Sequence, residues 1–374
     1  MRIGILSFHA SHNYGSMLQA YALQQYLQSI GHEVEIINLR TEAQKRLYAF
    51  PMKLQKGNKK KLLMSLLNPI WLLRECAKWY KYESFLRHNL KLSDKEYKSW
   101  EAIKDDLPKL RYQCIITGGD QIWNLSCADF DAAYFLPSKL NGISKISYSP
   151  SFGNMLPYIT KKEELFIKEN LADYSFISVR EKSMQDYLSQ QLNRQIEVLI
   201  DPTLLLNLNY YSKILIKKPL IEKKYIYYYS PWLYPNVESL ALRISRLLEL
   251  PIVTSSPHII FKRGFETAPV TGPAEFINLI ENAALVIGNS YHLVIFSLLF
   301  HKEFISIGGE KDARIKDILS RLSLTERGMV NEENYKTISL PTIDFEKVDR
   351  IITEMRHYSM TSLKSFLEAE NKST

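Results

Sequence analysis

The sequence predicts an α/β protein made of two Rossmann-like domains that face each other across a cleft. Three observations support this. Its 374 residues exceed the length of one ordinary domain. Short apolar runs alternate with segments of helical periodicity, and this alternation occurs twice along the chain. Hydrophobic residues make up 46% and charged residues 24%, as in ordinary globular proteins.

The first forty residues predict a strand, a helix and a second strand. An apolar run at 3–8 is followed by a polar loop at 9–15. Apolar residues then recur at helical spacing over 16–30, and Gly31 suits the position just after a helix. Residues 34–39 resume a strand, so the chain opens as a βαβ unit.

The alternation then continues to the end of the chain. Further strands are expected at 111–117, 143–148, 175–179, 196–200, 225–229, 251–253, 285–287 and 303–307, with helices at 238–250, at 273–281 and from 293 onward. We therefore expect a first domain at 1–204, a second at 205–350, and a carboxyl-terminal helix at 351–374 that packs back on the first.

The net charge of +8 is concentrated in residues 41–110. This stretch holds 16 Lys and Arg against 8 Asp and Glu, which leaves 32 of each kind elsewhere. It contains Lys59–Lys61, an apolar run at 62–73 and the aromatic residues Trp71, Trp79, Tyr80 and Tyr82. Such a basic helical insertion suits an anionic membrane surface. The alternative is a helical insertion packed on the first domain, with its basic face in solvent.

Several protein classes are excluded. The apolar run would reach about 18 Å as a helix, against a hydrocarbon core of about 30 Å. The amino terminus lacks the apolar core of a signal peptide. Cys76, Cys114 and Cys127 are an odd number without a C-x-x-C pair, which disfavours a disulfide framework and a zinc site. No nucleic-acid motif accompanies the charge. We expect a cytoplasmic protein.

The functional residues are expected in loops at the carboxyl ends of strands, where open α/β sheets bind ligands. Four loops qualify, at 9–15, 118–123, 180–181 and 288–292. In the last loop, His292 is expected at a helix amino terminus, where an anion is attracted and an imidazole can donate a proton. The alternative is a structural histidine that caps the loop.

The loop at 118–124 combines two glycines with Asp120 and Trp123. Glycines allow the backbone to approach a ligand, the tryptophan offers a flat face to a sugar ring, and Asp120 can accept a hydroxyl proton. The alternative is a turn followed by a core tryptophan. Arg180 can clamp a carboxylate or phosphate, or else form an ion pair with Glu181 or another acid. There is no P-loop, dinucleotide fingerprint or metal-ligand spacing.

Taken together, the motifs resemble the polysaccharide pyruvyl transferase family. The matching segments are Asn13-Tyr14-Gly15, Leu18–Leu23, Gly118–Asn124, Ser147-Tyr148, Ser151–Gly153, Ser178–Glu181, Asp201–Leu205, Asn289–His292 and Phe296-Ser297. Two positions depart from the pattern. Leu293 stands where a glycine often follows the histidine, and Ser290 stands where some relatives have arginine.

The resemblance implies a GT-B-like fold and transfer of the enolpyruvyl unit of phosphoenolpyruvate to a sugar diol, which gives a pyruvate ketal. The acceptor would be a polysaccharide or an oligosaccharide precursor that is linked to a polyprenyl lipid. Neither a metal nor another cofactor is required. His292 would be the general acid and Asp120 a base or acceptor-orienting group. The donor side would comprise Arg180, Asn289, Ser290 and Arg314, the last replacing the missing arginine. The acceptor side would comprise His9, Asn13, Tyr14, Gly15, Gly118, Gly119, Gln121 and Trp123.

Two other functions remain open. One is a glycosyltransferase with a nucleotide-sugar donor, in which Glu275 or Glu281 would bind the ribose diol. The other is a carbohydrate-binding protein at the membrane that catalyses nothing.

Overall fold

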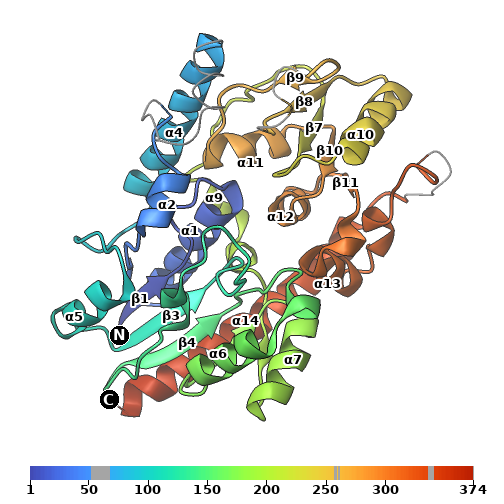
Figure 1. Cartoon of the computed structure of the whole chain (residues 1–374). Coiled ribbons are helices and arrows are strands. Elements are labelled where there is room, and N and C mark those ends of the chain that lie inside the picture. Colours follow the sequence, from blue (N-terminus) through green and yellow to red (C-terminus); the bar gives the residue numbers. More distant parts are fainter. Residues whose placement is uncertain (52–67, 257–258, 260–261, 336–340, 374) are drawn as a thin grey trace. The chain divides into compact units, whose positions relative to one another are not determined.

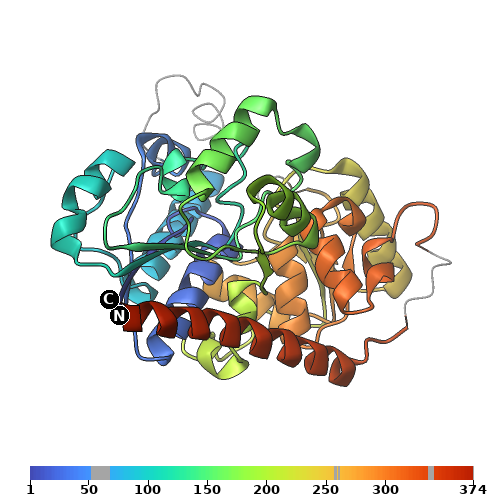
Figure 2. The ribbon, with the colours of Figure 1, turned by 90° about the horizontal axis from the view of Figure 1, so that it is seen from below.

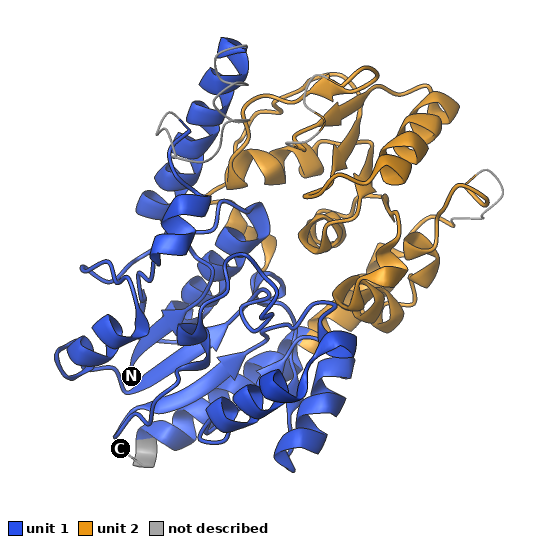
Figure 3. Cartoon of the chain, in the orientation of Figure 1, with its two compact units in different colours: residues 1–206, 356–374 blue, residues 207–355 orange. Residues whose placement is uncertain are grey.

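The computed structural model describes residues 1–51, 68–256, 259, 262–335 and 341–373. The chain divides into two compact units, residues 1–206 with 356–374 and residues 207–355 (Figure 3). The expected boundary between the domains lay at residues 204 and 205. Part of the predicted basic insertion, including Lys59–Lys61, lies outside the described residues.

Unit 1 contains a parallel four-stranded sheet in the order β2-β1-β3-β4 (Figure 1). A separate parallel pair, β5-β6, follows it and continues from β4 through a bridge between Ile146 and Phe176. The strands are β1 (Arg2–Leu6), β2 (Glu33–Ile36), β3 (Cys114–Gly118), β4 (Ser144–Tyr148), β5 (Ser178–Val179) and β6 (Glu197–Val198). The helices are α1 (Tyr14–Ser29), α2 (Glu42–Leu47), α4 (Pro69–Asn89), α5 (Trp100–Leu110), η1 (Ala132–Phe135), η2 (Leu156–Tyr158), α6 (Lys161–Leu171), α7 (Lys182–Leu192) and α8 (Pro202–Leu205).

Helices cover both faces of the sheet in unit 1. Buried residues of α5, η1, α6 and α7 form one apolar cluster with residues of β1 and β3. Helix α1 connects β1 to β2, in the opposite direction to the connection that carries α5 from β2 to β3. Because parallel crossovers are right-handed, α1 therefore lies on the other face. This is the doubly wound arrangement that the sequence predicted.

Unit 2 contains a parallel five-stranded sheet in the order β11-β10-β7-β8-β9. Its strands are β7 (Ile226–Tyr229), β8 (Ile252–Thr254), β9 (Glu266–Thr267), β10 (Leu285–Gly288) and β11 (Phe304–Ser306). Its helices are α9 (Leu208–Tyr211), α10 (Pro235–Leu248), α11 (Pro273–Glu281), α12 (Tyr291–Leu299), η3 (Gly309–Lys311), α13 (Ala313–Arg321) and η4 (Thr325–Gly328). The prediction of two Rossmann-like α/β domains is confirmed, whereas the cleft between them stays a prediction.

The tyrosine-rich strand β7 is buried on both faces of its sheet. Tyr227 and Tyr229 pack their rings against Phe276 of α11. Ile226 and Tyr228, which point the other way, join the apolar cluster of α10. A parallel strand covered on both sides needs a continuous run of bulky residues, and this explains the composition of the segment.

Helix α14 (Phe345–Ser373) is one long helix (Figure 2), and its residues from Arg356 onward belong to unit 1. There the Tyr26 hydroxyl donates to the carbonyl of Met360 at 3.4 Å, and the Ser359 hydroxyl accepts from the backbone N–H of Ile200 at 3.1 Å. The ring of Phe366 packs against Phe176. Among the described residues, no helix is both long and apolar enough to cross a bilayer.

Candidate functional site

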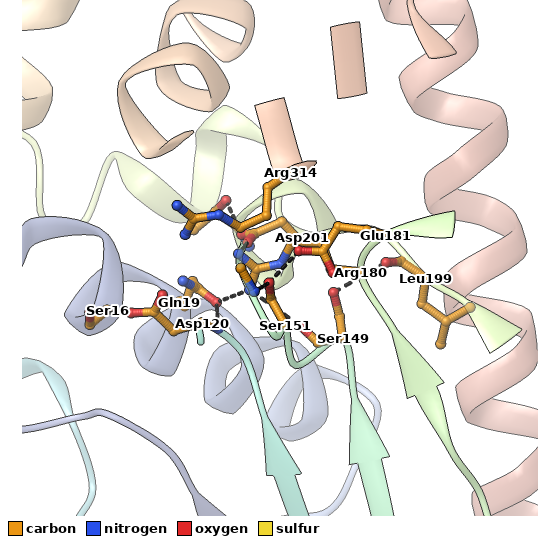
Figure 4. A network of polar contacts seen from close by, with 12 residues as sticks. Ser16, Gln19, Asp120, Ser149, Ser151, Arg180, Glu181, Leu199, Asp201 and Arg314 are labelled. Atoms are coloured by element: carbon orange, nitrogen blue, oxygen red, sulfur yellow. Dashed lines mark hydrogen bonds and ion pairs between the residues drawn. The ribbon is translucent and has the colours of Figure 1, made fainter. Parts of the chain in front are cut away.

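The carboxyl ends of β3, β4 and β5 carry a buried polar network in unit 1 (Figure 4). Arg180 follows β5 and is only 3% exposed. Its guanidinium pairs with Asp201 at 3.1 Å and donates to the side-chain Oε1 of Gln19 at 2.7 Å and to the backbone carbonyl of Ser149 at 3.2 Å. Arg180 thus has an acid partner, as the alternative interpretation required, and this acid is Asp201.

Gln19 of α1 joins Asp120 to Arg180. Its Oε1 accepts from the backbone N–H of Asp120 as well as from the Arg180 guanidinium (Figure 4). Asp120 has a φ of +54°, a left-handed conformation that is uncommon for a residue with a side chain. Its carboxylate accepts from the hydroxyl of Ser16, also on α1. Asp120 is therefore held by two side chains of one helix face and is 8% exposed.

The two glycines before Asp120 are required by packing. A Cβ at Gly118 would lie 2.6 Å from the carbonyl oxygen of Tyr148, and one at Gly119 would lie 2.7 Å from Oε1 of Gln19. Gly119 also has a φ of +70°. Close approach of β4 and α1 thus accounts for both residues. Gln121 lies at the edge of this turn and accepts a hydrogen bond from the side chain of Asn124 at 2.8 Å.

The predictions that Trp123 and His9 contact the acceptor are wrong. Trp123 is 0% exposed, stacks on Phe135 and donates its indole N–H to the carbonyl of Tyr134 at 2.9 Å, so neither ring face is open to a sugar. His9 is also 0% exposed. Its two ring nitrogens bond to Ser7 and Asn38, and burial lowers its pKa. Both residues are structural.

The loop after β1 places Asn13, Tyr14 and Gly15 at the start of α1. Asn13 is exposed and caps the helix, accepting from the backbone N–H of Gly15 at 2.9 Å. Tyr14 is buried and stacks on Tyr82 of α4 at 5.5 Å between ring centroids. The local function of this motif is thus to begin a helix, because its first N–H groups need an acceptor.

Helix α4 belongs to the predicted insertion and packs on this loop. Tyr82 is buried, and the indole N–H of Trp79 donates to the carbonyl of Tyr48 at 3.0 Å, so neither is a free interfacial aromatic residue. Ile70, Leu73 and Tyr80 on the same helix are 66%, 70% and 61% exposed. Their spacing places them on one side of α4. An exposed apolar face therefore remains.

In unit 2, the predicted general acid His292 and three of the predicted donor residues, Asn289, Ser290 and Arg314, lie at the start of α12. Asn289 and Ser290 follow β10, and His292 occupies the first turn of α12 with 5% exposure. Ser290 is the residue before the helix, yet its side chain does not cap the N–H groups of the first turn. Such N–H groups favour an anion.

Arg314 reaches the same place from α13. Its guanidinium lies over the ring of Tyr291, 5.5 Å from the ring centroid, and binds Asp312 through two bonds of 3.1 and 2.6 Å. Burial would raise the pKa of Asp312, but the charge of Arg314 and its hydrogen bonds keep this pKa below its ordinary value. Arg314 therefore lies beside the start of α12 and is ion-paired with Asp312.

Sequence reasoning did not assign several residues of these networks. Gln19 and Asp201 lie within the family-like motifs, but the hydrogen bond from Arg180 to Gln19 spans 161 residues, and no local pattern predicts it. Ser151 also lies within a family-like segment, whereas Ser16 and Ser149 belong to none and a single serine predicts no contact by itself. Among the described residues, no group of three His, Cys, Asp or Glu side chains could hold a metal ion.

A family model described as polysaccharide pyruvyl transferase matches residues 13–310. The chain belongs to this family. Among curated proteins, none matches the sequence. The structure of this polysaccharide pyruvyl transferase family member is nevertheless similar to solved structures that are distant in sequence.

Two similar structures are UDP-GlcNAc 2-epimerases. The enzyme from Neisseria meningitidis, bound to UDP-GlcNAc, is 10% identical with a TM-score of 0.52, and 100% of each chain is covered. The enzyme from Methanocaldococcus jannaschii is 11% identical with a TM-score of 0.51, over 95% of this chain and 93% of that one. A Listeria monocytogenes protein provisionally assigned the same activity is 10% identical with a TM-score of 0.59, over 99% and 97%. These likenesses confirm the GT-B-like fold.

Proposed function

We propose that this protein is a ketal pyruvyl transferase that uses phosphoenolpyruvate as its donor and a diol of a sugar as its acceptor. The proposal rests on family membership and on one observation in unit 2. Helix α12 begins at the carboxyl end of β10, and the side chain of Ser290 does not cap the N–H groups of its first turn. His292 and Tyr291 lie in this turn, and the guanidinium of Arg314 lies over the ring of Tyr291. An anion-binding helix end next to an imidazole suits a substrate that is an anion and must be protonated.

In the proposed reaction, protons are exchanged among His292, the donor, the two sugar hydroxyls and the departing phosphate. A proton from His292 adds to the methylene carbon of phosphoenolpyruvate, and the central carbon becomes an oxocarbenium-like cation. One sugar hydroxyl attacks this carbon and loses its proton, and the carbon–oxygen bond to phosphate breaks with its electron pair leaving on phosphate. The second hydroxyl closes the ketal and loses its proton. Of the two hydroxyl protons, one restores His292 and the other leaves with phosphate.

The test is phosphate release that requires both phosphoenolpyruvate and a sugar acceptor. The product should gain the mass of one pyruvate less one water. His292→Ala should lower the rate about 10²–10⁴-fold, the usual contribution of a general acid. His301→Gln is the matched control, because His301 is an exposed histidine of the same unit paired with Asp349, and its rate should stay within twofold. Retention of more than roughly a third of the rate by His292→Ala would refute the role.

The alternative function uses a nucleotide-sugar donor. Because the similar Neisseria enzyme binds UDP-GlcNAc, this compound is the nucleotide sugar to test. The two carboxylates that such a donor would use are poorly placed. Glu275 accepts from the backbone N–H of Gly272 at 2.8 Å and so caps its own helix. Glu281 ends α11, which runs back to the amino end of β10, the edge of the sheet away from ligands. Stabilisation against heat by UDP-GlcNAc and not by phosphoenolpyruvate would favour the alternative, whereas stabilisation by glycans alone would indicate a binding protein.

We also propose a cytoplasmic location, with α4 lying on an anionic membrane surface near a lipid-linked acceptor. The exposed apolar residues Ile70, Leu73 and Tyr80 support this, as do the lysines 59–61 in the sequence. Each basic residue near such a surface contributes about 1 kcal/mol of attraction. The protein should therefore bind phosphatidylserine vesicles at low salt, and Lys59–Lys61→Gln should weaken binding without slowing the reaction on a short free acceptor. No binding at low salt would refute the membrane proposal alone.

A further inference from the structure

His12 and Glu83 form a histidine–carboxylate pair that no family-like motif includes. His12 lies in the loop after β1, at the carboxyl end of that strand, and Glu83 lies on α4. Nε2 of His12 and Oε1 of Glu83 are 3.1 Å apart, and the two side chains are 12% and 7% exposed. This pair lies at the edge of the sheet where α/β enzymes carry out their chemistry.

Arg40 fixes the carboxylate of Glu83. Its two terminal nitrogens donate to Oε1 and Oε2 of Glu83 at 2.8 and 3.2 Å. Burial would raise the pKa of Glu83, but the hydrogen bonds from His12 and Arg40 lower it to about 2. Glu83 is therefore ionised at neutral pH, and an ionised carboxylate can only accept a hydrogen bond.

The tautomer of His12 follows from this partner. Since Glu83 accepts, Nε2 of His12 carries the hydrogen, and in a neutral ring Nδ1 then holds a lone pair. Burial lowers the pKa of His12, with the positive charges of Arg40 and Lys78 acting in the same direction and Glu83 opposing them. Within the described ranges, no residue hydrogen-bonds to Nδ1. A neutral ring with a free lone pair and a fixed orientation is a general base.

The loop that carries His12 is held on both sides. The hydroxyl of Ser11 donates to Asp129, and that of Ser16 donates to Asp120. The imidazole stacks on the ring of Tyr82 with 4.9 Å between centroids and an angle of 6°. Such support keeps a catalytic ring in one geometry.

Side chains suited to a sugar border the imidazole. The ring of Tyr48 lies 5.2 Å and that of Trp79 lies 6.1 Å from the ring of His12, measured between centroids. The hydroxyl of Tyr48 donates to Asp129 at 2.6 Å. Amphipathic aromatic rings beside carboxylate oxygens can pack on the apolar face of a sugar and bond to its hydroxyls.

We infer that His12 is the general base for the acceptor hydroxyl and that Glu83 positions it, in a sugar site bordered by Tyr48 and Trp79. The inference rests on the proposed function and names the group that activates its acceptor. As the hydroxyl oxygen bonds to the central carbon of the protonated donor, its O–H bond breaks and the proton moves to Nδ1. The resulting imidazolium is paired with Glu83 until the proton leaves with the released phosphate.

The test measures, for each variant, the phosphate that is released from phosphoenolpyruvate. The acceptors are methyl hexopyranosides that carry a free hydroxyl pair, and a reaction without sugar, in which only water can accept, gives the background. His12→Phe keeps a stacked ring without a base and should lower kcat at least 100-fold with little change in the acceptor KM, since a base contributes about 10²–10⁴-fold. Glu83→Gln presents an amide that can bond to either tautomer, and it should lower kcat at least tenfold. His88→Phe is the control, because His88 is an exposed histidine of the same helix, and it should change kcat less than twofold.

A second measurement needs no acceptor. Heteronuclear NMR of the imidazole nitrogens in the native protein should show His12 neutral with its hydrogen on Nε2 at neutral pH, and Glu83→Gln should change this signal. A hydrogen on Nδ1, or a kcat in His12→Phe close to that of the native protein, would overturn the inference alone. Absence of phosphate release from the native protein with any acceptor would overturn the proposed function, and the inference with it.

Discussion

Replacing Asp201 by Asn should destabilise unit 1 strongly, because it removes the carboxylate that pairs with a buried arginine. Arg180 and Asp201 lie 3.1 Å apart, and their side chains are 3% and 0% exposed. Oδ1 of Asp201 caps α8 by accepting from the backbone N–H of Thr203 at 2.9 Å. Asparagine keeps this acceptor, so the substitution changes only the charge and the group that faces Arg180.

The expected loss follows from the burial of the pair. Removing one partner of a buried ion pair costs about 3–5 kcal/mol, since the remaining charge cannot be solvated. For a unit of this size, 1 kcal/mol shifts the melting temperature by about 2–4 °C, so Asp201→Asn should melt about 6–20 °C lower. The exposed pair of Lys182 and Asp186, with side chains 65% and 63% exposed, provides the control. Asp186→Asn should cost at most about 1 kcal/mol.

Added anion then distinguishes a purely structural arginine from one that also binds the donor. Phosphoenolpyruvate bound elsewhere should stabilise Asp201→Asn and Asp186→Asn equally, by about 2.7 kcal/mol at a hundred times its Kd, so a larger gain in Asp201→Asn indicates that Arg180 contacts the ligand. Calorimetric scans of both variants with phosphoenolpyruvate, and with chloride at equal ionic strength, measure the effect. A loss below about 1 kcal/mol for Asp201→Asn would refute the reasoning from the buried pair.

Substitutions at Arg180, Trp123 and His9 test the remaining assignments, with Trp232→Ala as the control for Trp123. Arg180→Ala should weaken phosphoenolpyruvate binding at least tenfold and Arg180→Lys should recover only part of it, and an unchanged affinity in calorimetry would refute the donor role. Trp123→Ala should cost about 3–5 kcal/mol in denaturant titrations, whereas Trp232→Ala, at a side chain 65% exposed, should change the free energy of unfolding by less than about 0.5 kcal/mol. Burial lowers the pKa of His9, so the unfolded chain binds the proton first as the pH falls below about 6.5, and stability should decrease by up to about 1.4 kcal/mol per pH unit. His9→Gln should lose this part of the slope, and an identical slope in both proteins would contradict the burial argument.

The fold was largely predictable because each unit repeats one local pattern. Apolar runs at 3–8 and 285–287 predicted β1 and β10, since strands covered on both faces must be apolar throughout. The sequence did not predict strand β9 (Glu266–Thr267), because it has only two residues and neither is apolar. Helix α10 begins at Pro235, three residues before the expected start, and helix ends are the least certain feature of a periodic pattern.

The site was predictable only where function depends on neighbours in the sequence. The segment 289–292 predicted a strand-to-helix turn, and the structure places Asn289, Ser290 and His292 there together. The guanidinium of Arg314 lies over the ring of Tyr291 in the same turn, and its role as the replacement for a missing arginine stays a prediction. The pair of His12 and Glu83 spans 71 residues, and no spacing rule relates a loop after β1 to the middle of α4.

Burial separates two motif residues of unit 1 from His12, the base inferred above. Gln19 and Trp123 are at most 1% exposed, and their polar groups bond within the protein. A sequence motif therefore also includes residues that fix the conformation of a loop. Fixing a loop requires specific side chains, just as catalysis does. His12 differs from them in one respect. The structure gives it an orienting carboxylate on one nitrogen and assigns no described partner to the other, as a base requires.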